Sequence, residues 1–144
     1  MQPRATYDDA KLLLELYEMR REDRMRKARA WFSGSFRPRT LDDFTALCPP
    51  GSDENASYRM VTTYWEMVAS FITSGVLNQE LFFQSGRELL LVWERLRDIL
   101  PALREKNTDP FAYANLETVA QAYISFLDRR SPGTYAAFSA RQRG

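Results

Sequence analysis

Two glutamates of the chain, Glu66 and Glu94, each follow a tryptophan, in the pairs Trp65-Glu66 and Trp93-Glu94. Burial beside an aromatic ring raises the pKa of a carboxyl group. Two such carboxyls facing each other in a helical core could act as general acid and base or could ligate a cation. The alternative is structural, because Glu66 falls on a polar helical stripe and Glu94 is three residues from Arg97. We expect exposed or paired glutamates, and we assign no metal site.

Other chemistry is limited by the absence of histidine from the 144 residues. Without it there is no Ser-His-Asp or Cys-His relay, no histidine-bearing zinc site and no Glu-x-x-His di-iron bundle. Cys48 has neither a histidine nor a neighbouring lysine to activate it, which predicts an inert thiol. The glycines are isolated, so no phosphate-binding loop is formed. The sequence therefore predicts no cofactor, no catalytic residues and a protein that is not an enzyme.

A basic cluster is the most distinctive charged feature. It consists of Arg20, Arg21, Arg24, Arg26, Lys27 and Arg29. Such a helix could bind phosphates, with Trp31 and Phe32 stacking on bases. However, residues 1–39 carry ten basic and six acidic side chains, and residues 40–85 carry one basic and six acidic, net charges of +4 and −5. The two segments could neutralise each other within one molecule or across a homodimer, or the cluster could be a solvated face. Nucleic-acid contact is the least favoured of these alternatives, because the net charge of the whole chain is only +1.

The chain is also rich in aromatic residues, with nine phenylalanines, seven tyrosines and three tryptophans. These side chains could line a ligand pocket between helices or simply fill the core. The candidate pocket residues are Tyr58, Tyr64, Trp65, Glu66, Phe71, Trp93, Glu94 and Tyr123. Core filling is the simpler interpretation, and both alternatives stay open.

The spacing of apolar residues predicts an all-α fold in one domain over residues 1–144, a compact bundle of four main helices plus two or three short ones. A long first helix over 6–33 begins with Thr6 as N-cap and the acids Asp8 and Asp9 in the first turn, and it meets no glycine or proline before Gly34. It would carry the basic cluster. The last segment, 130–144, either docks as a short helix or frays.

Several helix ends carry local signals. Thr40 begins a short helix with a capping-box spacing, and Ser85 with Glu88 has the same spacing before a later helix. Gly75 is placed to close a helix in the left-handed conformation. Pro101 should kink its helix or end it one turn early.

Four stretches together look familiar: residues 9–14 (DAKLLL), 25–32 (MRKARAWF), 58–67 (YRMVTTYWEM) and 91–96 (LVWERL). They resemble a group of uncharacterised bacterial helical proteins of unknown function, and the similarity extends from about Tyr7 to Leu127. The resemblance implies a compact helical fold and a bacterial cytoplasmic setting. It brings no activity, cofactor or catalytic residue with it.

The function expected from these features is a non-enzymatic protein-interaction or scaffolding module that self-associates through its first helix, with an unidentified protein partner also possible. One alternative is nucleic-acid or anionic-ligand binding through the basic cluster, and another is small-molecule binding in an aromatic pocket. The lone Cys48 cannot form an internal disulfide and suits a reducing cytoplasm. We expect no membrane span, because the charge-free stretch Met67–Gln79 is shorter than the roughly 20 apolar residues that a span needs.

Overall fold

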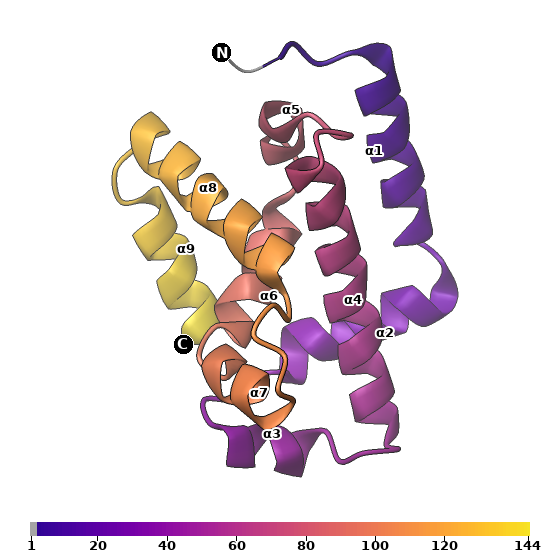
Figure 1. Cartoon of the computed structure of the whole chain (residues 1–144), viewed down its shortest axis with the longest axis vertical. Helices are drawn as coiled ribbons and strands as arrows, with labels where there is room; N and C mark the ends of the chain where they lie inside the picture. Colours follow the sequence, from indigo (N-terminus) through magenta and orange to yellow (C-terminus); the bar gives the residue numbers. More distant parts are fainter. Residues whose placement is uncertain (1–2) are drawn as a thin grey trace.

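The computed structural model describes residues 3–144, and these residues form nine α-helices and no strand (Figure 1). The helices are α1 (Tyr7–Met19), α2 (Asp23–Ser35), α3 (Leu41–Leu47), α4 (Asp53–Thr73), α5 (Gln79–Phe83), α6 (Arg87–Leu96), α7 (Leu100–Lys106), α8 (Ala114–Arg130) and α9 (Thr134–Arg143). The all-α fold expected from the apolar spacing is confirmed.

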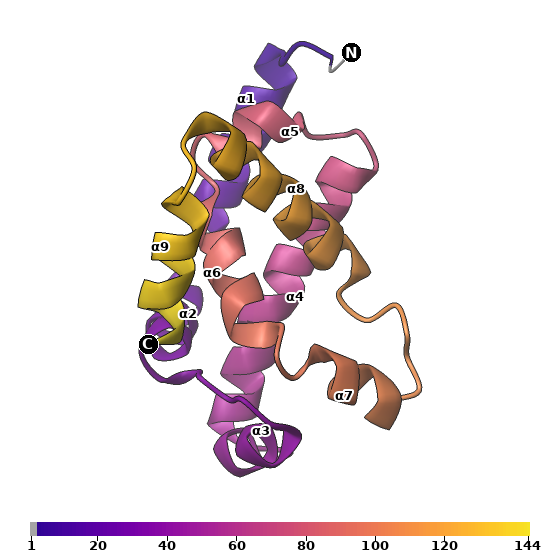
Figure 2. The ribbon, with the colours of Figure 1, turned by 90° about the vertical axis from the view of Figure 1, so that its left-hand side faces the viewer.

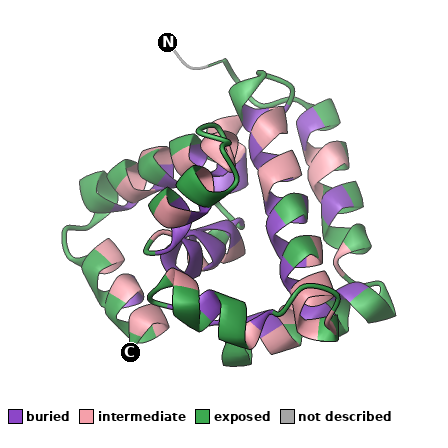
Figure 3. Cartoon of the chain, turned by 60° about the horizontal axis from the view of Figure 1, so that its bottom comes forward, coloured by how far each residue is buried: buried purple, intermediate pink, exposed green. Residues whose placement is uncertain are grey.

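Helix α4 is the longest element, and α2 and α8 make the most extensive packing contacts with it. Helix α6 lies in the middle of the molecule and contacts α4, α8 and α9 (Figures 1 and 2). Helix α1 runs beside α4 at the outer edge, and α3 and α7 lie at one end of the molecule. Buried residues gather in the centre, whereas the outer helices are mostly exposed or half-buried (Figure 3).

The prediction of one long first helix over 6–33 is wrong in one respect, because the structure divides this segment into two helices, α1 and α2. The expected N-cap at its start is present and forms a capping box: the Thr6 hydroxyl accepts from the Asp9 amide, and the Asp9 carboxylate accepts from the Thr6 amide. The break comes at Arg20–Glu22. Glu22 accepts hydrogen bonds from the amides of Arg24 and Met25 and so caps α2. Cations at the C-terminal end of one helix and acids at the N-terminal start of the next both stabilise their helix by interacting with its dipole.

The other helix ends follow the local signals with one exception. Thr40 forms the capping box of α3, Gly75 has a φ of +79° just after α4, and Pro101 lies in the first turn of α7 after α6 has ended. The capping box predicted for Ser85 and Glu88 is wrong. Gly86 is the N-cap of α6 without a side-chain hydrogen bond, and Glu88 is engaged in tertiary contacts instead.

Arg95 is a buried cation that joins three parts of the chain. Its guanidinium donates to the carbonyls of Phe32, Ser33 and Phe36, where α2 ends, and to the carbonyl of Gln142 in α9. Burial lowers its pKa to about 10, so it remains charged at neutral pH. Each contact satisfies a carbonyl with a charged donor, which is stronger than a neutral hydrogen bond.

The C-terminal segment docks as α9, mainly through polar contacts. Phe138 is its only buried residue within the described helix. The hydroxyls of Tyr135 and Ser139 both donate to the carboxylate of Glu94 at 2.6 Å, and Arg143 binds Asp98 at 2.6 Å. A helix with so small an apolar face depends on these hydrogen bonds for its position.

Replacing Arg95 with methionine is expected to lower the free energy of unfolding by about 2–4 kcal/mol, because buried carbonyls lose their charged donor. Urea denaturation measures the change. The control is Arg26→Met, since Arg26 is exposed and has only a local ion pair with Asp23; it should change stability by less than about 0.5 kcal/mol. Equal losses in the two variants would contradict the role assigned to Arg95.

Candidate functional site

A cavity lies under α1, between α1, α4 and α5. Its volume is about 390 Å³, which falls within the range of about 300–1,000 Å³ typical of small-molecule sites. The lining residues are Ala10, Leu13, Leu14, Leu16, Tyr17 and Arg20 from α1 and its end, Tyr64, Trp65 and Val68 from α4, and Leu81, Phe82, Ser85 and Gly86 from α5 and the turn after it. Arg20 is the one charged side chain in this lining.

Arg20 belongs to a charge cluster centred on Glu88. The Glu88 carboxylate accepts two short hydrogen bonds from Arg29, at 2.7 and 2.9 Å, and one from the Trp65 indole at 3.1 Å. The Arg20 guanidinium lies 3.6 Å from the same carboxylate and within 5.3 Å of the ring centroids of Trp65 and Tyr17. The hydrogen bond to Glu88 raises the pKa of Arg29. Two guanidinium groups therefore share one carboxylate, and the cluster keeps one positive charge.

Helix α1 is held over the cavity by few contacts. Its buried residues are Asp9 and Leu16. The Asp9 carboxylate accepts from the Asn78 amide at 2.8 Å, which ties the start of α1 to the start of α5. At the other end, the Tyr64 hydroxyl donates to the Leu16 carbonyl. Burial raises the pKa of Tyr64 to about 12, so the hydroxyl keeps the proton that it donates.

The remaining residues of the basic cluster do not gather at this cavity. Arg21 and Arg26 are exposed and pair with acids three residues away. Arg24 and Lys27 line a separate hollow between α2 and α4. Among residues 3–144 no ion pair joins 1–39 to 40–85, although Arg24 and Lys27 line the same hollow as Asp53 and Glu54. The tertiary partners of Arg29 and Arg39 are acids of α6 and its end, Glu88 and Asp98.

Of the eight candidate pocket residues, only Tyr64 and Trp65 line the cavity. Tyr58 hydrogen-bonds the Tyr113 hydroxyl at 3.0 Å, and Tyr123 donates to the Phe83 carbonyl. Phe71 is half-buried near the end of α4. Trp93 lines a different hollow with Arg97 and Tyr135. Most of the candidate aromatic residues therefore fill the core, and two of the candidates, Tyr64 and Trp65, also line the cavity under α1.

The two glutamates after tryptophan are engaged by different helices and share no partner. Glu66 accepts from the side-chain amide of Asn115 and the backbone amide of Leu116, both at 2.8 Å, and so caps the start of α8. Glu94 is buried and binds α9 and Arg97. Among residues 3–144 no group of three cysteines or acids could hold a metal ion. Burial raises the pKa of Cys48 to about 11, which keeps the thiol protonated at neutral pH.

A second surface was not predicted from the sequence. Met19, Met25, Met60 and Met67 line one open groove of about 730 Å³ along α4 and the start of α2, and Tyr64 separates this groove from the cavity under α1. Methionine side chains are flexible and are common on protein-binding surfaces. Met19 and Met25 lie at the turn between α1 and α2, whereas Met60 and Met67 lie in α4, far away in the sequence. The turn brings the first two methionines to α4.

A family model described as a domain of unknown function, DUF4760, matches residues 5–123. The chain belongs to the DUF4760 family. This confirms the resemblance to an uncharacterised family, and the matched region contains every lining residue of the cavity in this DUF4760 member. No curated protein and no solved structure matches the chain. None of the helices described for this DUF4760 protein has both the length and the apolarity needed to cross a membrane.

The contact between Asp9 and Asn78 predicts a pH-dependent attachment of α1. Hydrogen bonds from the Thr6 and Asn78 amides hold the pKa of Asp9 below its usual 3.8. The stability that this ionised carboxylate contributes is therefore complete well above pH 3.8 and is lost as the pH falls through the lower, folded-state pKa.

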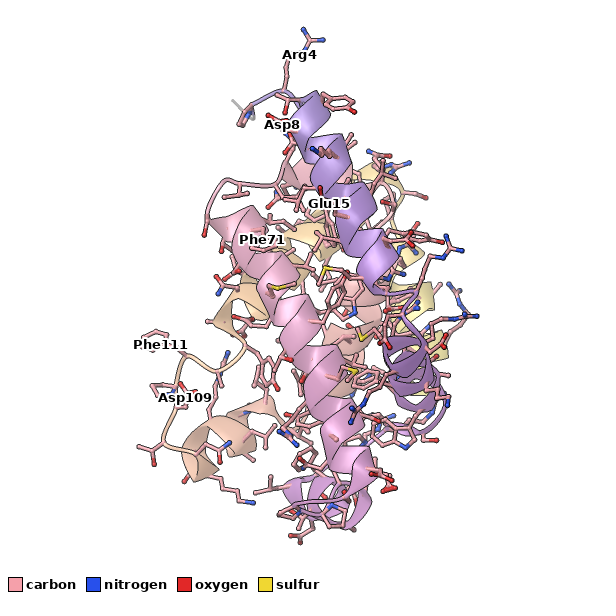
Figure 4. The ribbon with its side chains drawn as sticks, turned by 90° about the vertical axis from the view of Figure 1, so that its right-hand side faces the viewer. Arg4, Asp8, Glu15, Phe71, Asp109 and Phe111 are labelled. Atoms are coloured by element: carbon pink, nitrogen blue, oxygen red, sulfur yellow. The ribbon has the colours of Figure 1, made fainter. Side chains whose placement is uncertain are left out.

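At neutral pH, Asp9→Asn should make the amides of α1 exchange with deuterium faster than in the wild-type protein. The difference in unfolding free energy between wild type and variant should shrink as the pH falls below 3.8. Asp8→Asn is the control, because Asp8 is an exposed residue of the same helical turn (Figure 4). If the amides of α1 exchange no faster in Asp9→Asn than in the wild-type protein, Asp9 does not anchor the helix.

Proposed function

We propose that this DUF4760 protein is a non-enzymatic protein-interaction module that self-associates through α1. The observation that carries the proposal is an exposed apolar stripe on that helix. Tyr7, Leu14 and Tyr17 are 81%, 70% and 54% exposed, although they lie on a well-formed helix. Exposed apolar side chains that are contiguous on one helix are typical of interaction surfaces.

The spacing of this stripe supports a helical partner. Tyr7, Ala10, Leu14 and Tyr17 are separated by three, four and three residues, the spacing of the a and d positions of a coiled coil. The stripe lies beside the side of α1 that packs on the molecule, where the buried apolar residue is Leu16. Ala10, Leu14 and Tyr17 also line the rim of the cavity, but Tyr7 and most of the Leu14 side chain stay exposed.

A second copy of the chain fits this stripe as an antiparallel partner. In a two-fold arrangement Tyr7 of one copy lies level with Tyr17 of the other, and the small Ala10 lies level with the larger Leu14. Antiparallel pairing also places the two helix dipoles favourably. Because the same residues face each other, a closed dimer results and not a filament.

The basic cluster gives less support to the nucleic-acid alternative. Arg20 and Arg29 share Glu88, and Arg21 and Arg26 pair with local acids. These pairs reduce the positive charge that is free to contact phosphates. The cytoplasmic setting is part of the same proposal and is supported by the single cysteine, which leaves the fold without an internal disulfide.

Replacing Leu14 with arginine should abolish self-association, because the charge would lie in the centre of the helix pair. Sedimentation equilibrium over a range of protein concentrations should give a dimer for the wild-type protein and a monomer for Leu14→Arg. The thermal midpoint of the monomer should change little, because Leu14 is exposed.

The matched control is Phe111→Arg. Phe111 is 80% exposed, but it projects from the loop between α7 and α8, away from α1 (Figure 4). This variant should dimerise like the wild-type protein. A wild-type protein that stays monomeric at high concentration, or a Leu14→Arg variant that still dimerises, would refute the proposed interface.

A further inference from the structure

We infer that the cavity between α1, α4 and α5 binds an aliphatic monocarboxylate, with the apolar tail inside the cavity and the carboxylate at Arg20. This inference does not depend on the proposed self-association. The exposed stripe and the cavity are adjacent on α1, because Ala10, Leu14 and Tyr17 of the stripe also line the cavity.

The walls of the cavity select an apolar ligand. Leu13, Leu16, Val68, Leu81 and Phe82 contribute aliphatic and aromatic surface, and the cavity volume of about 390 Å³ leaves room for a medium-length alkyl chain. Removing such a chain from water stabilises the complex in proportion to the number of methylene groups that become buried. The walls alone, however, would accept a neutral alkane or alcohol equally well.

Arg20 adds selectivity for an anion. Its Nε atom is buried and has no hydrogen-bond partner, the only such side-chain atom found among residues 3–144. A buried donor without a partner costs free energy, and because Nε is not exposed to the cavity in this structure, the guanidinium must turn for a ligand oxygen to recover that cost. The same guanidinium lines the cavity and lies against the rings of Trp65 and Tyr17.

The charge of the surrounding cluster points to the same class of ligand. Arg20 and Arg29 face a single acid, Glu88, and the three side chains together carry a charge of +1. Glu88 forms its closest contacts with Arg29 and with the Trp65 indole, which leaves Arg20 as the weakest-held partner at 3.6 Å. One carboxylate at Arg20 would neutralise the cluster, and a charge-assisted hydrogen bond from the guanidinium to the ligand would be stronger than one from a neutral donor.

Closure of α1 over the ligand follows from how this helix is held. Asp9 and Leu16 are its only buried residues among those described, and Leu13 and Leu14 border the cavity. A bound alkyl chain would fill the space beneath α1 and add contacts along its length. The ligand should therefore slow hydrogen exchange in α1 more than in the other helices.

The test uses isothermal titration calorimetry of the full chain with sodium decanoate below its micellar concentration, and with decanol as the uncharged analogue. We expect decanoate to bind and decanol to bind at least about tenfold more weakly. Arg20→Met should lose about tenfold or more in decanoate affinity. Arg21→Met is the matched control, because Arg21 is an exposed neighbour that lies outside the cavity lining. The Arg21→Met variant should bind decanoate with the affinity of the wild-type protein.

Arg20→Met should fold, because Glu88 retains Arg29 and Trp65 as partners. A second variant, Ser85→Phe, leaves Arg20 intact and narrows the cavity at its border, and it should also weaken decanoate binding. The proposal is overturned if the wild-type protein does not bind decanoate, if decanol binds as tightly, or if both variants bind like the wild type. Binding to phosphatidylglycerol vesicles without binding of free decanoate would assign Arg20 to a lipid surface and would equally overturn it.

Discussion

The structure depends on three charged side chains of the central helix α6. They are largely shielded from solvent and are bound by groups of other elements. Glu88 binds Arg29 and the Trp65 indole, Glu94 binds α9, and Arg95 binds the carbonyls at the end of α2. A buried charge without partners is far more costly than one that is fully hydrogen-bonded. The positions of α2, α4 and α9 around α6 are therefore coupled to one another through these contacts.

Helix α1 is outside this network except at its end, and this explains its unusual surface. The contact of Arg20 with Glu88 fixes the turn between α1 and α2, and Asp9 fixes the opposite end. Between these two points α1 spans a cavity and contacts the core through Leu12, Leu13 and Leu16. Apolar side chains of α1 therefore border the cavity and also reach the solvent, so both proposed activities arise from one helix.

The sequence predicts those features that depend on near neighbours. The N-cap at Thr6, the capping box at Thr40 and the left-handed turn at Gly75 are local, and all three were expected. The break after α1 was missed because neither glycine nor proline marks it, although the change from two arginines to two acids is a readable signal. Glu88 could not be predicted, since its spacing from Ser85 fits a local cap while its actual partners lie 59 and 23 residues away. The cavity likewise depends on where α1 settles against α4.

The docking of α9 places a constraint on related sequences. The family match ends at residue 123, within α8, yet Glu94 and Arg95 inside the matched region take hydrogen-bond partners from Tyr135, Ser139 and Gln142 beyond it. A relative with a different C-terminal segment would leave this acid and this cation facing water or an unmatched surface. Residues 94 and 95 should therefore covary with the segment after α8, so that chains with a Glu-Arg pair in α6 also carry a polar helix able to cover it.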